Sequence, residues 1–362
     1  MSVASNIDPQ TAEAYLFCRN VARREAKNFY WAFRVLPRHK SDAMCAVYAF
    51  MRRADDLSDD ESKSIEDRRV EMAAWLNSWR ASRASAAKDY STRSTEDELF
   101  QNGCRPEMNC HSEQSEESLH FARFTTVCTI TENTLDPVFR ALAHTQKAFN
   151  IPDALLEELV AGTTMDLEPR ATSGEIAPGQ LDPAQTYATF DDLYRYCYLV
   201  ASVVGLVCIK IFGYTDPRAE KFAEETGVAF QLTNILRDVK EDIERDRVYL
   251  PLDLLDEFGE SPAELRTLAA GRAMTERERA MLATLAIRAE KYYLAANKLT
   301  PLLDRDSRAA MWVLVTIYHR LLARIADHKM EVFRTRVALS TTEKLSVMAR
   351  GAVMAAWNRV FA

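Results

Sequence analysis

Hydrophobic residues recur at intervals of three and four along most of this chain. The clearest stretches are residues 43–50, 155–160, 193–211, 222–235 and 311–325. This spacing places apolar side chains on one face of an α-helix, whereas the strict alternation typical of strands is scarce. The predicted breaks between helices fall at Gly213, Pro217, Gly259 and Pro262. The pattern therefore predicts an all-α fold.

One segment, residues 82–133, does not follow this pattern. It is rich in Ser, Thr and Glu and includes the stretch NGCRPEMNCHSEQSEESLHF. Its few apolar residues bury too little surface to offset the entropy lost on ordering. We therefore expect one helical domain over residues 1–362 with a flexible surface insertion at 82–133, for which a lid or a partner-binding loop is the functional alternative.

Composition and charge exclude several classes of function. The chain of 362 residues has a net charge of −7, so it lacks the surplus of cations that nucleic-acid binding requires. Its seven cysteines contain no CxxC pair, which is typical of reduced thiols in the cytoplasm. The sequence does not open on a basic region followed by an apolar run, so we expect no signal peptide. The apolar stretch 197–212 falls short of the ~20 residues of a membrane span and is predicted to be a buried helix.

Two acidic motifs carry the candidate chemistry, and the first is RRADDLSDD at residues 52–60. Asp55 and Asp59 are four residues apart and share a helix face, as do Asp56 and Asp60. Like charges at this spacing cost about 0.2–0.5 kcal/mol per pair. Taken alone, the motif fits a solvated helix end as well as a site that uses its carboxylates together.

The second motif, QLTNILRDVKED at residues 231–242, repeats the spacing. Asn234, Asp238 and Asp242 are each four residues apart and line one stripe of a helix. Two such stripes on facing helices would surround a cavity with an acidic rim, which can hold a diphosphate only with hard divalent cations between them. Mg²⁺ suits such a site because it takes a few carboxylate oxygens together with phosphate and water. The cations available for the remaining phosphate charge are Arg52 or Arg53, Arg237, Arg245 and Arg247.

The second motif, extended to GVAFQLTNILRDVKEDIERDRVYLP at residues 227–251, resembles the second signature of the squalene and phytoene synthase family. The stretch YCYLVASVVGLVC at residues 196–208 resembles the first signature. The likeness runs from about residue 26 to about residue 345 and leaves out only 82–133 and the termini. Two positions depart from the family pattern: Thr226 replaces an aliphatic residue, and Asn28 replaces a serine that contacts diphosphate.

This resemblance implies the isoprenoid-synthase helical fold with a central cavity, and it implies a set of site residues. Mg²⁺ ligands would be Asp55, Asp59, Asn234, Asp238 and Asp242. Residues in contact with diphosphate, metal or the prenyl chain would be Arg52, Phe29, Phe33, Val200, Gln231, Asn234, Arg237, Tyr318 and Arg336. Tyr48 and Tyr196 would lie near the reacting carbons.

The implied reaction is a head-to-head condensation of two isoprenoid diphosphates. Metal ions neutralise the leaving diphosphate of one allylic substrate, and the double bond of the second attacks the resulting cation. An apolar cavity protects the cation from water, and aromatic faces such as Phe29 and Tyr48 stabilise it by about 0.5–2 kcal/mol each.

The choice of product depends on cavity depth, and Phe33 is the informative residue. Phytoene-forming relatives often have a small residue there, so a bulky Phe33 favours two farnesyl diphosphates and presqualene diphosphate. The alternative is a phytoene synthase that joins two geranylgeranyl diphosphates. NADPH is required only if a reductive second step follows. The expected location is cytoplasmic, and the C-terminal stretch TTEKLSVMARGAVMAAWNRVFA either packs on the core or touches the inner face of a membrane to release an oily product.

Two rival functions remain. A chain-elongating prenyltransferase usually carries DDxxD twice, which the second motif here does not match. A non-catalytic assembly factor of the same fold would be expected to lack the metal-binding aspartates, and both sets are present. Alanine substitution at Asp55 and Asp238 separates these cases, since only catalysis requires the carboxylates.

Overall fold

The computed structural model describes residues 7–60, 62–100, 135–165, 167 and 186–360. The first half of the chain forms α1 (Pro9–Glu25), α2 (Lys27–Val35), α3 (Arg38–Ser58), α4 (Ile65–Phe100), α5 (Pro137–Ala148) and α6 (Asp153–Thr164). The second half forms α7 (Phe190–Cys197), η2 (Tyr198–Ser202), α8 (Val203–Phe212), α9 (Arg218–Glu244), α10 (Leu252–Glu257), α11 (Pro262–Ala269), α12 (Glu276–Leu299), η3 (Thr300–Leu302), α13 (Arg305–Asp327) and α14 (Thr341–Val360). Within the described ranges there is no strand, only an isolated bridge between Tyr214 and Leu303, and the all-α prediction is confirmed.

The predicted breaks coincide with helix ends because each supplies the backbone conformation that an end requires. Gly213 ends α8 with a positive φ of 79°, a conformation that favours glycine. Pro217 immediately precedes α9, and Pro262 occupies the first turn of α11 behind a Ser261 side chain that accepts from the Glu264 N–H. Gly259, with a φ of 60°, follows α10.

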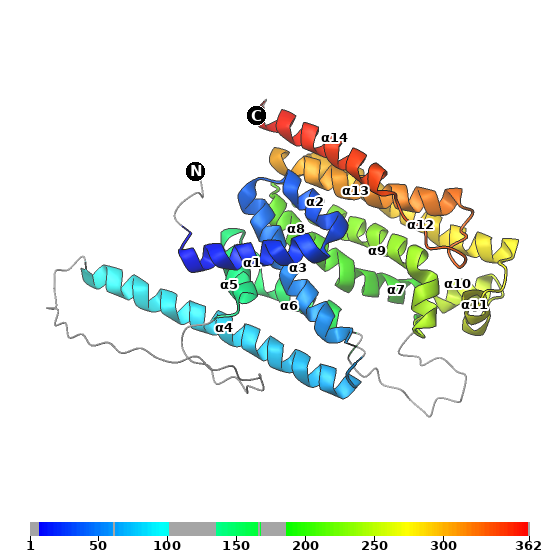
Figure 1. Ribbon diagram of the computed structural model, residues 1–362, viewed down its shortest axis with the longest axis horizontal. Helices are drawn as coiled ribbons and strands as arrows, with labels where there is room; N and C mark the ends of the chain where they lie inside the picture. The colour runs from blue at the N-terminus through cyan, green and yellow to red at the C-terminus, as the bar shows by residue number, and fades with distance from the viewer. Residues whose placement is uncertain (1–6, 61, 101–134, 166, 168–185, 361–362) are drawn as a thin grey trace, which may run out of the picture.

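The predicted insertion at 82–133 divides into two parts. Helix α4 continues to Phe100, so residues 82–100 are helical rather than irregular. No glycine or proline interrupts residues 65–100, and Ala, Arg and Glu are frequent there; these good helix formers sustain a helix without a strong apolar stripe. Figure 1 shows the second half of α4 extending past the other helices. The rest of the insertion lies outside the described residues.

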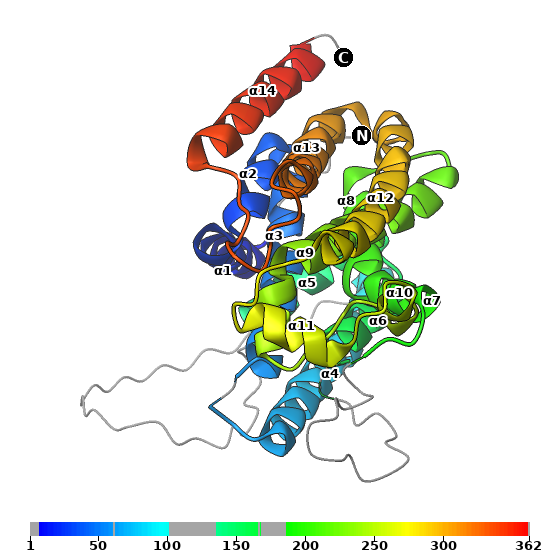
Figure 2. The same ribbon diagram turned by 90° about the vertical axis from the view of Figure 1, so that its right-hand side faces the viewer.

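Two hydrophobic clusters meet along the middle of the molecule. One gathers α1, α2, α3, α5, α6 and α8, and the other gathers α7, α9, α11 and α12. Phe29, Phe230 and Val315 pack against both clusters. Figures 1 and 2 show α14 on the outer side of α13, away from α9. The seam between the two clusters is where the cavity lies.

Two helical stretches, Phe190–Phe212 and Arg305–Asp327, are long and apolar enough to cross a membrane by length and composition alone. Both contribute residues to the wall of the central cavity, among them Val204 and Leu314, and both pack within the core clusters. Packing in the core and along the cavity is therefore sufficient to explain their apolar character.

Candidate active site

A cavity of about 530 Å³ runs between α2, α3, η2, α8, α9 and α13. This volume lies within the ~300–1,000 Å³ that is usual for small-molecule sites. Its mouth is polar and is formed by Arg52, Asp55, Gln231, Asn234 and Arg237. The remaining wall is largely apolar. The two acidic motifs, which are far apart in sequence, thus contribute to one opening.

Helix geometry explains why these polar groups converge. On α3 the buried stripe includes Ala46, Phe50 and Ala54, and the neighbouring stripe turns Tyr48, Arg52 and Asp55 to the cavity. On α9 the positions three or four apart, Gly227, Phe230, Gln231, Asn234 and Arg237, face it from the other side.

Burial makes the mouth electrostatically costly. Burial, followed by the neighbouring Asp59 carboxylate, raises the pKa of Asp55 to about 6, while the Arg52 guanidinium opposes this rise. The Arg52 Nη2 atom lies 2.6 Å from Asp56 Oδ1, an ion pair within α3. Arg52 Nε and Asn234 Oδ1 are buried and have no hydrogen-bond partner among the described residues. Such groups are expected where a charged, hydrogen-bonding ligand binds.

Asp238 lies between two arginines beside the mouth. It accepts a hydrogen bond from Arg237 Nε at 2.8 Å and from Arg336 Nη2 at 2.8 Å. Burial raises the pKa of this carboxyl, but the hydrogen bonds and charge of Arg237 and Arg336 outweigh it and hold the pKa below its usual value. Arg336 comes from the segment between α13 and α14, so a residue far away in sequence completes this cluster.

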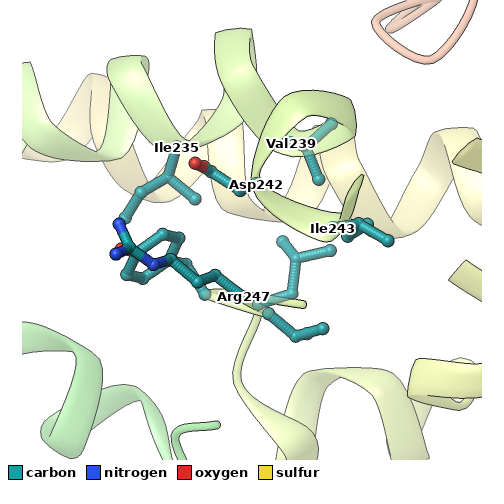
Figure 3. A pocket seen from close by; sticks show the side chains of 8 residues that line it. Ile235, Val239, Asp242, Ile243 and Arg247 are labelled. Carbon is teal, nitrogen blue, oxygen red and sulfur yellow. The ribbon is translucent and has the colours of Figure 1, made fainter. Parts of the chain in front are cut away.

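Asp242 lies one turn further along α9, in a narrow recess with Arg247. Figure 3 shows the two side chains extending to the same side of the C-terminal end of α9. Burial and the charge of Asp238 raise the pKa of Asp242 to about 7, and Arg247 opposes the shift. Asp246 adopts a φ of 59°, and the Arg247 N–H returns to the Asp242 carbonyl at 2.8 Å. This helix-ending turn holds Arg247 next to Asp242.

An aromatic wall joins the mouth to the apolar interior. Phe230 stacks on Tyr318 with ring centroids 4.4 Å apart, and Phe29 lies 5.9 Å from Tyr318. Phe33 lies 6.5 Å from Phe29 and 6.4 Å from the ring of Tyr48. Burial raises the pKa of Tyr318 to about 12, so its hydroxyl stays protonated and can donate a hydrogen bond at neutral pH.

The structure brings most of the predicted site residues to this cavity. The lining includes Phe29, Phe33, Tyr48, Arg52, Asp55, Val200, Gln231, Asn234, Arg237 and Tyr318. Asp59, Asp238, Asp242 and Arg336 lie outside the lining, and the last three flank the mouth as described. Tyr196 also lies outside the lining: it stacks on Tyr249 at 4.9 Å and lies 5.3 Å from Tyr187.

Other lining residues were not predicted from the sequence. Phe230 could have been predicted, because it directly precedes Gln231 of the second motif. Met44, Phe212, Leu299 and Met311 close the apolar end, and nothing in the sequence distinguishes them from ordinary core residues. Of the two departures from the family pattern, Thr226 lines the cavity and donates its hydroxyl to the Phe222 carbonyl at 2.7 Å, which satisfies its polarity within α9. The side chain of Asn28 lies outside the described residues.

A π-helical turn, η2, interrupts the helix that runs from α7 to α8. Its residues Val200 and Ala201 face the cavity. A Cβ atom on Gly227 of α9 would lie 2.5 Å from Ser202 Cα, and one on Gly162 of α6 would lie 2.4 Å from the Leu199 carbonyl oxygen. Glycines on two flanking helices thus let the backbone of η2 approach closely. Such π-turns are frequent at functional sites.

No group of three or more His, Cys, Asp or Glu side chains is close enough to hold a metal ion by itself in the part of the chain that the structure describes. The donor set nevertheless fits Mg²⁺, because this ion takes only one or two carboxylates from the protein and the rest from phosphate and water. Asn234 Oδ1 has no hydrogen-bond partner among the described residues, and the pKa values of Asp55 and Asp242 are raised. A nearby cation would stabilise all three oxygen-bearing groups.

The helices around this cavity have the isoprenoid-synthase helical fold, which the solved dehydrosqualene and squalene synthases described below share. The sequence profile of the squalene/phytoene synthase family matches residues 22–343, and the chain belongs to this family.

Curated relatives and solved structures agree with this assignment. The phytoene synthase of Mycobacterium tuberculosis is 32% identical over 340 residues, which cover 93% of this chain and 90% of the relative. The phytoene synthase of Arthrospira platensis is 28% identical and covers 92% of this chain and 91% of the relative. A dehydrosqualene synthase in complex with ligand shares the fold with a TM-score of 0.66 and 24% identity, covering 95% of this chain and 97% of that chain. Squalene synthase HpnC from Alicyclobacillus acidocaldarius has a TM-score of 0.66 and 21% identity, covering 89% and 97%.

Proposed function

We propose that this protein is a Mg²⁺-dependent prenyltransferase that joins two molecules of farnesyl diphosphate head to head, giving presqualene diphosphate. The observation that carries the proposal is a single cavity that combines a charged mouth for diphosphate with an apolar, aromatic interior for prenyl chains. A polar head and a long hydrocarbon tail are the two features that this lining complements.

Asp55, Asp59, Asn234, Asp238 and Asp242 are the residues that would hold Mg²⁺, and the bound ion would supply positive charge to neutralise a departing diphosphate. Arg52 and Arg237 bind phosphate oxygens directly, because guanidinium groups suit their geometry. Arg336, which is paired with Asp238, would be the further cation near the phosphates. The Tyr318 hydroxyl donates a hydrogen bond at the mouth.

The interior residues control the allylic cation after the diphosphate leaves. The faces of Phe29, Tyr48 and Phe230 offer cation–π attraction of about 0.5–2 kcal/mol each. Phe33 is only 3% exposed and excludes water from the same wall, which protects the cation from hydrolysis.

The bulk of Phe33 supports the C15 substrate. It lies against both Phe29 and Tyr48, so the cavity cannot widen there without moving two other rings. The second candidate is condensation of two geranylgeranyl diphosphates to phytoene, which is supported by the names of the relatives at 28–32% identity.

Incubation of the purified protein with Mg²⁺ and either diphosphate, with and without NADPH, followed by mass spectrometry of the products, tests both candidates. Presqualene diphosphate from the C15 substrate supports the proposal, and squalene on addition of NADPH extends it to a second step. Phytoene from the C20 substrate alone selects the second candidate. If the protein is folded but forms no product from either substrate, the result favours a non-catalytic assembly factor.

We also infer a cytoplasmic enzyme that touches a membrane through α14. Leu345, Val353 and Trp357 on this helix are 49%, 69% and 64% exposed, while Val347 and Gly351 face α13 and the core. Exposed Leu, Val and Trp on one helix suit an interfacial contact. Flotation with anionic phospholipid vesicles tests this, and Trp357→Ser together with Val353→Ser should reduce the bound fraction.

A further inference from the structure

Helix α12 exposes large apolar side chains on the face opposite its buried one. Ile287 and Leu294 are each 60% exposed, whereas Leu285, Ala289 and Tyr293 of the same helix are buried in the cluster that includes α9. Figure 2 shows α12 on the side of α13 that is away from α14. This face is therefore separate from the α14 surface inferred above to touch a membrane.

The exposed side chains belong to one stripe along α12. Its seven positions are three or four residues apart, so they share a face of the helix. Six of them are exposed and Ala283 is partly exposed. The stripe begins with an acidic residue in the first turn, continues with small residues and ends with large apolar and basic ones: Glu276, Ala280, Ala283, Ile287, Lys291, Leu294 and Lys298.

An open groove of about 570 Å³ runs beside the first half of this stripe, between α12 and α13. Its bottom is apolar and its rim is charged. The small side chains of α12 leave this space, which the second half of the helix fills with Leu294. The apolar part of the groove is formed by Ala280, Ala283, Ala286, Ile287, Leu322, Ala326 and Met330.

The stripe is complementary to itself about its centre, Ile287. A two-fold axis through Ile287 places each residue opposite the one equally far along the other half of the helix. Ala280 then faces Leu294 of the second copy, so a large side chain enters the groove beside a small one. Glu276 faces Lys298 of the second copy, so opposite charges meet at both ends. Lys291 extends its methylene chain over Ala283 of the second copy.

The same charges disfavour the parallel alignment of two α12 helices. In that arrangement Glu276 would face its own copy and Lys298 would face its own copy, so both ends would carry like charges. Leu294 would also meet Leu294 and leave the groove empty. The order of residues along the stripe thus selects the antiparallel, two-fold arrangement, in which the same patch is used by both subunits.

We propose that a second copy of this chain docks on the α12 stripe, forming a two-fold dimer in which the two α12 helices pack antiparallel through Ile287 and Leu294. The 24 residues of α12 span ~36 Å, and a helix is ~10–12 Å wide. The contact therefore covers about 400 Å² per subunit, less than the ~800 Å² of a standard interface. We expect a reversible dimer with a Kd on the order of 10 μM. This inference is independent of the proposed prenyltransferase function.

Sedimentation equilibrium of the full chain, at concentrations up to about 0.5 mM, measures the Kd. Leu294→Glu places a carboxylate in the apolar groove, and Ile287→Glu places two carboxylates on the axis, so each should raise the Kd at least tenfold. The matched control is Val70→Glu: Val70 is also 60% exposed but lies on α4. Its Kd should stay within twofold of that of the parent protein.

Charge exchange tests the pairing at the ends of the stripe. Glu276→Lys and Lys298→Glu each create a like-charge pair and should raise the Kd several-fold, whereas the double variant restores opposite charges and should return the Kd to within about twofold. Glu276 also pairs with Arg279 at 3.1 Å within α12, but its side chain is 92% exposed, so its loss costs little stability. Thermal unfolding followed by circular dichroism confirms that each variant is folded.

Disulfide cross-linking tests the position of the axis. At an interaxial distance of 8–10 Å and a Cα radius of ~2.3 Å, the two Ile287 Cα atoms lie about 4–6 Å apart, which a disulfide can bridge. The two Leu294 positions lie ~21 Å apart along the helices. Mild oxidation should therefore cross-link Ile287→Cys but not Leu294→Cys, and the parent protein gives the background from native cysteines.

Three outcomes overturn the proposal. The first is a parent protein that remains monomeric at about 0.5 mM. The second is a dimer whose Kd does not change in Leu294→Glu or Ile287→Glu. The third is equal cross-linking of Ile287→Cys and Leu294→Cys. If the parent protein is monomeric but binds phospholipid vesicles, and Leu294→Glu abolishes that binding, the occupant of the stripe is a lipid surface instead of a second copy.

Discussion

The contact between α9 and the π-helical turn η2 gives the sharpest test of how the site is held together. In Gly227→Ala, the new Cβ would lie 2.5 Å from Ser202 Cα, 2.7 Å from Ser202 N and 2.9 Å from the Ala201 carbonyl carbon. Favourable carbon–carbon contacts lie at ~3.5–4.0 Å, so the overlap is about 1 Å against three backbone atoms. No side-chain rotation relieves it, and η2 or α9 must move.

The net cost follows from two opposing terms. Overpacking of a rigid interior costs about 1–3 kcal/mol, and backbone overlap belongs at the upper end of that range. Replacement of glycine by alanine within a helix returns about 1 kcal/mol. We therefore expect Gly227→Ala to lower the free energy of unfolding by about 2 kcal/mol. Activity should fall as well, because Ala201 adjoins the displaced residue and faces the cavity.

Gly205→Ala is the matched control, since the closest approach of its Cβ is 3.2 Å to a single atom, the Ala223 carbonyl oxygen. In Gly205→Ala, the small cost of this overlap and the gain in helix propensity should nearly cancel, so the free energy of unfolding should stay close to that of the parent protein. Urea unfolding followed by far-UV circular dichroism gives the midpoint and slope for both variants and the parent protein. Equal stability of the two variants would refute the close packing of α9 on η2.

Three further predictions concern buried or paired charges. The Lys40 Nζ atom is buried and donates to the Phe212 carbonyl and to Asp306, each at 2.7 Å, so Lys40→Met should lower the free energy of unfolding by about 1–3 kcal/mol in urea titrations; an unchanged midpoint would contradict this role of Lys40. Asp55→Asn should abolish activity yet stabilise the metal-free protein at pH 8, by at most about 3 kcal/mol. Because folding raises the pKa of Asp55 to about 6, the penalty exists only where the carboxyl ionises, so the gain should vanish near pH 4. Arg324 and Ser340 lower the pKa of Glu343 to about 2, so α14 should stay attached near pH 5 and loosen as the pH falls toward 2, seen as a change in Trp357 fluorescence that is absent in Glu343→Gln.

The sequence was sufficient to predict the fold class and most of the mouth. Helical periodicity and the few glycines and prolines indicated an all-α chain, and the breaks at Gly213 and Pro217 coincide with helix ends. The spacing of four between acidic residues indicated which side chains share a face. Arg52, Asp55 and Asn234 were therefore predicted at one opening, because a regular helix converts sequence spacing directly into direction.

Contacts between distant segments were harder to predict. The spacing of four predicted that Asp238 shares a helix face with Asn234 and Asp242, but its ion pair with Arg336 depends on the path of the segment after α13. Tyr196 belongs to a family signature, yet the structure packs it against Tyr249 and Tyr187. Residues 82–100 were predicted as part of a flexible insertion, and the helix found there could not be predicted, because a helix supported by propensity rather than by an apolar stripe leaves no periodic pattern.

The apolar depth of the site was invisible in the sequence for a related reason. Met44, Phe212 and Leu299 have the same burial as residues that only fill the core, so composition and periodicity treat them alike. The charged mouth differs because its ionised groups lower the stability of the fold. Burial and neighbouring carboxylates raise the pKa of Asp55 and of Asp242, so the ionised form of each is disfavoured. A sequence retains such groups at helical spacing only where their cost is offset by function. Candidate reaction chemistry can therefore be inferred from the residues that destabilise the fold, whereas the shape of the apolar interior depends on residues that stabilise it and becomes apparent only in three dimensions.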